Sequence, residues 1–127
     1  MKLVFDTSII IDALRRKSRA KEALLRFEES DDEIMLPSIV GFELFSGESS
    51  RKSGQARSIT AFLKYFEIVD LNWSIATKAG EIFRGGVKGL GVTDYIVAAT
   101  ALEMGAEVVT LNEKYFVKIP GLSIYPL

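Results

Sequence analysis

Residues 2–14 read KLVFDTSIIIDAL, a short apolar run that stops at an aspartate and is followed by apolar residues at helical spacing. The first run, residues 3–5, has the composition of a buried β-strand. Thr7 or Ser8 is suited to cap a helix directly after it. The segment therefore predicts a strand that ends at Asp6 and passes at once into a helix.

The same alternation continues along the chain. Further strands are predicted at residues 33–36, 68–69, 107–110 and 122–125, and helices at residues 20–29, 38–45, 56–66, 73–83 and 95–102. Thr93 is predicted to cap the last helix, residues 49–54 to form a turn, and residues 85–91, with four glycines, to form a mobile loop. Strands separated by helices predict a layered α/β fold with a mostly parallel sheet and right-handed crossovers.

The composition is that of an ordinary globular protein, with 48% hydrophobic and 26% charged residues. A chain of 127 residues predicts a single domain spanning residues 1–127. No apolar run approaches the length of a membrane span and no signal-peptide region follows Met1, so we expect a cytoplasmic protein without a membrane. Because the net charge is only −1, a nucleic acid partner would have to meet a local basic patch.

Cysteine and histidine are both absent from the chain. Their absence excludes disulfides, thiolate metal sites, the usual zinc ligands, catalytic triads and a histidine general base. The remaining chemistry is that of carboxylates, lysines and hydroxyl groups.

Three acidic residues stand at informative places in this pattern. Asp6 follows the first strand, Glu43 lies on the apolar side of its helix, and Asp94 opens an apolar helix. Each has a plainer explanation: turn capping for Asp6, a solvent-directed side chain for Glu43, and complementing the helix dipole for Asp94. Ligands of parallel α/β sheets bind beyond the carboxyl ends of the strands, where Asp6 and Asn112 are both expected.

Convergence of the three acids at one rim of the sheet would have a chemical consequence. Clustered carboxylates repel one another unless a cation neutralises them, and oxygen ligands without His or Cys select Mg²⁺ or Mn²⁺. Such ions bind phosphate oxygens and activate water. Convergence therefore predicts hydrolysis of a phosphodiester bond.

Four stretches in order resemble the successive signatures of PIN-domain proteins, and together they span nearly the whole chain. They are Val4–Ser8, Gly41–Leu44, Thr93–Ala101 and Val109–Phe116. The chain's size is most similar to that of the VapC-type toxins of toxin–antitoxin pairs. The resemblance implies a Rossmann-like three-layer α/β/α fold, endoribonuclease activity on RNA with Mg²⁺ or Mn²⁺, a homodimer, and inhibition by a cognate antitoxin that reaches into the active site.

Asp6, Glu43 and Asp94 match the acidic metal-site positions of that family. Asn112 stands at a fourth catalytic position that is often Asp, so we expect one tightly bound metal, with Glu113 as a minor additional candidate. Thr7, Ser8 and Thr110 are expected to support the site. The cations available for RNA are Arg15, Arg16, Lys17, Arg19, Arg51, Lys52, Arg57, Arg84 and Lys88, among which we select Arg84, Lys88 and Arg15 for substrate binding.

Other classes fit the sequence less well. Haloacid-dehalogenase-like phosphatases have a second acid two residues after the first, and this chain has Ser8 at that position. Receiver domains want paired acids before the phosphorylated residue, and a dinucleotide-binding domain wants a glycine fingerprint after the first strand; neither is present. The alternative kept is a catalytically weak PIN-like module that binds an antitoxin or RNA in a regulatory role.

Overall fold

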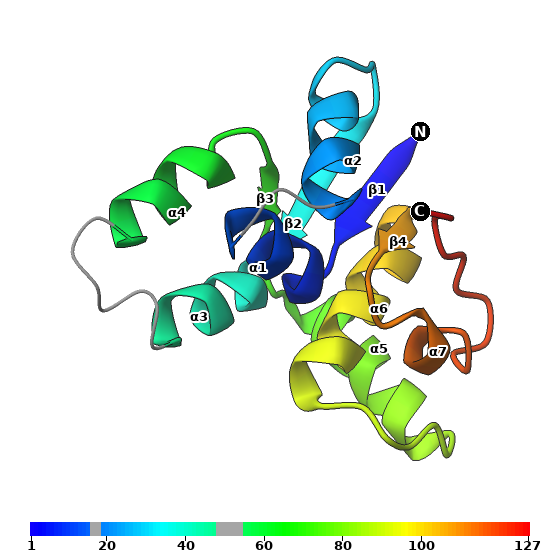
Figure 1. Ribbon diagram of the computed structural model, residues 1–127. Helices are drawn as coiled ribbons and strands as arrows, with labels where there is room; N and C mark the ends of the chain where they lie inside the picture. The colour runs from blue at the N-terminus through cyan, green and yellow to red at the C-terminus, as the bar shows by residue number, and fades with distance from the viewer. Residues whose placement is uncertain (16–18, 48–54) are drawn as a thin grey trace.

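The computed structural model describes residues 1–15, 19–47 and 55–127 (Figure 1). Its strands are β1 (Lys2–Phe5), β2 (Glu33–Pro37), β3 (Glu67–Val69) and β4 (Glu107–Val109). Its helices are α1 (Thr7–Arg15), α2 (Arg19–Glu28), α3 (Ser38–Ser46), α4 (Gln55–Leu63), α5 (Trp73–Arg84), α6 (Val92–Met104) and α7 (Glu113–Phe116). The turn expected at 49–54 and the cations at 16, 17, 51 and 52 lie outside the described residues.

The four strands form one parallel sheet in the order β3-β2-β1-β4. In the central strand, Val4 pairs with Met35 on one side and with Val108 on the other. The pairing extends one residue further, because the backbone N–H of Asp6 donates to the Val109 carbonyl at 3.0 Å. The parallel α/β prediction is confirmed, and Asp6 lies at the carboxyl end of the sheet.

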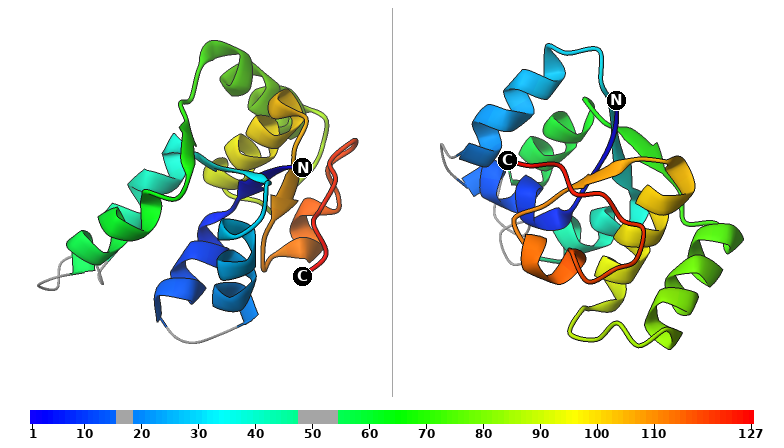
Figure 2. Two further views of the ribbon diagram at one scale, coloured as in Figure 1. Left: turned by 90° about the horizontal axis from the view of Figure 1, so that it is seen from above. Right: turned by 90° about the vertical axis from the view of Figure 1, so that its right-hand side faces the viewer.

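Helices cover both faces of the sheet, so that the fold has three layers. Seen from above, α1 and α2 lie on one side of the strands and α5 and α6 on the other (Figure 2, left). Helix α6 contacts β1, β2 and β4, and α5 packs on its outer side. Residues 95–101 are all buried, and four of them are Ala or Thr, whose small side chains let α6 lie close to the sheet.

Several local predictions were wrong. Helix α6 begins at Val92 with Gly91 at its N-cap, so Thr93 lies inside the first turn and is not the cap, and the Asp94 carboxylate accepts the Gly91 N–H at 3.0 Å. Helix α4 ends at Leu63, where the chain turns towards β3 through hydrogen bonds such as Phe66 N–H to the Leu63 carbonyl.

Residues 122–125 do not form a full strand. They contribute an isolated parallel bridge between Ile124 and Val108, together with hydrogen bonds from Val108 N–H and Tyr125 N–H. The last residues thereby cover the outer edge of β4. In the described part of the chain, every helix is too short or too polar to cross a bilayer.

Candidate active site

Asp6 is the centre of a buried polar network at the end of β1. Its side chain is only 2% exposed and accepts three hydrogen bonds. The backbone N–H of Thr7 donates to Oδ1 at 2.8 Å, while the hydroxyls of Ser8 and Thr110 donate to Oδ2 at 2.9 and 2.8 Å. Thr7 and Ser8 are therefore first-turn residues of α1 rather than its cap, and Asp6 itself bonds the start of the helix.

The surroundings of Asp6 shift the pKa of its carboxyl group. Burial raises the pKa of this carboxyl above its usual value, hydrogen bonds from Thr110 and Ser8 oppose the rise, and the negative charge of Asp94 adds to it. The carboxylate is thus oriented by three hydrogen-bond donors, and no cationic side chain of the described residues offsets its charge. A bound cation is the species that would restore the balance.

The same hydroxyls tie the loop after β4 to this network. The Leu111 N–H donates to Ser8 Oγ at 3.1 Å, and the Asn112 N–H donates to Thr110 Oγ1 at 2.9 Å. Asn112 stands at the start of α7 with its side chain exposed. The structure therefore brings Asn112, as predicted, to the rim of the network around Asp6.

Glu43 joins the site through Thr7. Helix α3 presents Glu43 in a partly buried position, and Thr7 Oγ1 donates to its Oε1 at 2.6 Å across 36 positions of sequence. The three hydroxyl groups therefore have different partners. Those of Ser8 and Thr110 donate to Asp6, whereas that of Thr7 donates to Glu43.

Asp94 reaches the site from the start of α6. Its Oδ2 accepts the Gly91 N–H at 3.0 Å, and its charge acts on Asp6. The plainer explanation, stabilisation of a helix start, therefore holds for Asp94, and its charge also acts on Asp6. The group of acids is open: within the described ranges, no three acidic residues are close enough together to enclose an ion.

The donors that do gather are all oxygens, from carboxylates and hydroxyls. Such a set fits Mg²⁺ or Mn²⁺ and does not fit zinc or a soft metal. The buried, donor-supported carboxylate of Asp6 is the strongest part of that fit.

A cation stands on the loop that leads into Asp94. Lys88 Nζ lies 3.9 Å from the centroid of the Phe83 ring, and that ring packs edge-on against Tyr95. The Tyr95 hydroxyl donates to the Val87 carbonyl at 2.6 Å. The glycine loop predicted to be mobile is thus tied to α6 at its middle, by a tyrosine that the sequence analysis assigned only to the helix.

The other two predicted substrate contacts are placed less informatively. Arg84 is an exposed residue at the end of α5. Arg15 ends α1, roughly 12 Å along the helix axis from Thr7. Arg57, on α4, is exposed as well.

Comparison with known proteins agrees with this geometry. The PIN-domain family profile matches residues 3–122. The chain belongs to the PIN-domain family. Its relatives include ribonuclease VapC19 of Mycobacterium tuberculosis, 30% identical over 96% of this chain and 97% of that protein, and ribonuclease VapC2 of Rickettsia felis, 32% identical over 96% and 95%. A crystal structure of VapBC2 from Rickettsia felis bound to a promoter DNA fragment contains a chain that this PIN domain matches with a TM-score of 0.86, at 26% identity over 98% of both chains.

Proposed function

We propose that the protein is a Mg²⁺- or Mn²⁺-dependent endoribonuclease, a single PIN domain over residues 1–127 that serves as the toxin of a toxin–antitoxin pair. One observation carries the proposal: a carboxylate that is 2% exposed, has three hydrogen-bond donors and lies beside a second acid at the carboxyl end of a parallel sheet. Burying a carboxylate costs free energy unless its charge is paired. Buried acids with perturbed pKa values therefore gather at functional sites. The ribonuclease names of the VapC relatives support the substrate.

Asp6 and Asp94 would hold the ion directly, and Glu43, the third predicted ligand, would act on it through a water, because no three acids of the described residues are close enough to enclose an ion. A carboxylate has about four lone pairs, and Oδ2 of Asp6 already accepts two hydrogen bonds whereas Oδ1 accepts one. Oδ1 is therefore the atom we assign to the metal. Bound there, the ion would supply positive charge at the phosphoryl oxygens and make a nearby water more acidic.

The chain's own residues orient the reaction. Thr7 holds Oε1 of Glu43, which leaves Oε2 to accept the proton of the attacking water. Asn112 contributes an amide without charge, so one tightly bound metal is expected rather than two. Lys88, fixed over Phe83, and Arg84 are assigned to the substrate's phosphates, with Arg15 as a more distant contact.

Cleavage of a structured RNA by the purified protein, with and without Mn²⁺, tests the proposal. The control is the double variant Asp6→Asn, Asp94→Asn, which should be inactive. Equal activity in this variant would assign the cleavage to a contaminant. Metal-dependent RNA binding without any cleavage by the wild type would favour the regulatory module instead.

Metal binding is testable apart from cleavage. Titration calorimetry should show that Asp6→Asn alone and Asp94→Asn alone each remove most of the affinity for Mn²⁺. Mg²⁺ at millimolar concentration should also raise the melting temperature of the wild type, because the ion binds only the folded site. An unchanged melting temperature together with unchanged binding in the variants would remove the metal site.

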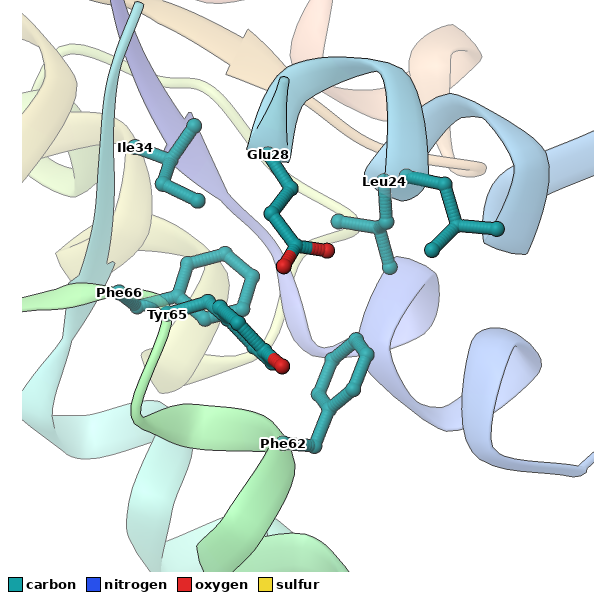
Figure 3. Close-up of a pocket in the computed structure, with 7 residues that line it drawn as sticks. Leu24, Glu28, Ile34, Phe62, Tyr65 and Phe66 are labelled. Atoms are coloured by element: carbon teal, nitrogen blue, oxygen red, sulfur yellow. The ribbon is translucent and has the colours of Figure 1, made fainter. Parts of the chain in front are cut away.

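The antitoxin that is expected to reach into the active site also needs an apolar docking place on this chain. A pocket of about 170 Å³ lies between α2 and α4, with Glu28 directed towards its apolar wall (Figure 3). Leu25 and Tyr65 at this pocket are 53% and 55% exposed. We assign it to an antitoxin segment with an apolar side chain and a neighbouring Arg or Lys. Leu25→Asp should prevent complex formation with a cognate antitoxin and leave RNA cleavage unchanged.

The homodimer is assigned to the face of α3 that carries Phe42, which is 70% exposed. Light scattering should show the mass of a dimer for the wild type and of a monomer for Phe42→Asp. A monomeric wild type would contradict the assignment.

A further inference from the structure

Two lysines, Lys114 on α7 and Lys118 in the turn after it, stand around one aromatic ring. Lys114 Nζ lies 5.0 Å and Lys118 Nζ 5.8 Å from the centroid of the Tyr115 ring. The ring is partly buried and both lysines are exposed. Neither ammonium is within ion-pair distance of a carboxylate among the described residues, and Glu113 on the same helix is no exception. The two positive charges are therefore gathered but not neutralised.

This cluster is connected to Asp6 by a short chain of contacts. Thr110 Oγ1 donates to Asp6 and accepts the Asn112 N–H, and the Asn112 carbonyl accepts the Tyr115 N–H at 3.0 Å. Figure 1 and the left view of Figure 2 place α7 and α3 on opposite sides of the end of β1. The lysines thus belong to the segment that follows the loop bonded to Asp6 through Thr110 and Asn112.

The electrostatics of the site give these charges a purpose. Asp6, Glu43 and Asp94 repel a phosphodiester backbone except where a metal ion offsets them, and the chain as a whole has a net charge of −1. An RNA strand crossing the acids therefore needs cations on either side. Lys88, over Phe83, is on the loop before Asp94. None of the cations predicted to bind substrate is on or next to α7.

We propose that Lys114 and Lys118, held by the Tyr115 ring, bind the phosphates of the RNA strand on the α7 side of the active site. The inference rests on the proposed ribonuclease function. Lysines that follow Asn112 by two and six positions were visible in the sequence. Lys118 comes to the same ring because the turn after α7 is closed by the Lys118 N–H, which donates to the Tyr115 carbonyl at 3.4 Å.

The test is the salt dependence of binding of an unstructured RNA oligonucleotide, measured by fluorescence anisotropy in EDTA so that the strand stays intact. Lys114→Ala and Lys118→Ala should each weaken binding and reduce the slope of log Kd against log salt by about 0.7, the value for one lost phosphate contact on a single strand. Tyr115→Phe should keep wild-type binding, whereas Tyr115→Ala should weaken it. Lys64→Ala, an exposed lysine after α4, is the matched control.

Cleavage of the same oligonucleotide with Mn²⁺ separates the two levels of the argument. A wild type that cleaves or binds RNA, with slopes unchanged in both lysine variants, overturns the α7 assignment and leaves the ribonuclease standing. A wild type that neither binds nor cleaves RNA overturns both. An equal loss of slope in Lys64→Ala means that binding follows overall charge, which also overturns the assignment.

Discussion

The two aspartates at the proposed metal site are built in different ways. Asp6 is almost wholly buried and accepts hydrogen bonds from Thr7 and Ser8 of α1 and from Thr110 after β4, whereas Asp94 is partly exposed and accepts the N–H of the N-cap residue of its own helix. A helix start benefits from an acid with or without a ligand. Asp6 also accepts the first N–H of its helix, but it does so in a buried place where desolvation raises its pKa. We therefore expect Asp6, more than Asp94, to be present for function.

The largest expected effect separates the two residues by activity. Asp6→Asn should lower the rate of RNA cleavage by about 10²- to 10³-fold, since it removes the charge that the site is built around. Asp94→Asn should lower it as well but retain the cap, because the amide oxygen still accepts the Gly91 N–H. Initial rates at saturating Mn²⁺ give the comparison, with the exposed Asp31→Asn as control. Equal rates for Asp6→Asn and wild type would contradict the central role of Asp6.

The donors around Asp6 should matter less than Asp6 itself. Thr110→Val removes a hydroxyl that orients the carboxylate and should weaken Mn²⁺ binding by roughly 10- to 100-fold. Thr7→Val should instead leave Mn²⁺ affinity nearer to wild type and lower the cleavage rate, and Thr7→Ser should restore it, because its contact is with Glu43. Calorimetry and cleavage rates measure the two effects. Thr60→Val, on the exposed side of α4, is the control.

The burial of Asp6 should also make the stability of the protein depend on pH. The pKa of Asp6 is raised in the folded protein, so the folded state binds its proton more tightly than the unfolded chain does. Metal-free wild type should therefore lose stability as the pH rises from about 4, the unfolded value, through the raised folded value. Asp6→Asn should lack this loss and melt higher than wild type at pH 8 in EDTA. Urea unfolding over this pH range is the measurement, and parallel curves would contradict the raised pKa assigned to Asp6.

The smallest expected effect concerns the loop before Asp94. Tyr95→Phe removes the hydroxyl that donates to Val87 and should cost about 0.5–1.5 kcal/mol in the free energy of unfolding. Hydrogen exchange should increase within residues 85–91, the loop that carries Lys88. Tyr65→Phe, an exposed tyrosine, should change neither quantity. Unchanged exchange in Tyr95→Phe would mean that the loop is held by other contacts.

Local pattern was sufficient to predict most elements of the fold. Residues 3–5 and 95–101 are apolar runs whose hydrophobicity alone demands burial, and both are buried in the sheet and against it. Helix starts were less predictable, because Thr93 has the side chain of an N-cap residue but the helix begins one residue before it, at Val92. There the Asp94 carboxylate accepts the N–H of the N-cap residue, Gly91.

The amino-acid sequence by itself determined an alternation of strands and helices with acids at the ends of elements, since those features depend on residues within one turn or one strand. The tertiary structure decided which hydroxyl serves which carboxylate. Thr7 meets Glu43 and Thr110 meets Asp6 because α3 and β4 pack beside the end of β1. Such contacts join residues 36 and 104 positions apart, and their distances depend on the packing of whole elements, which no local periodicity encodes.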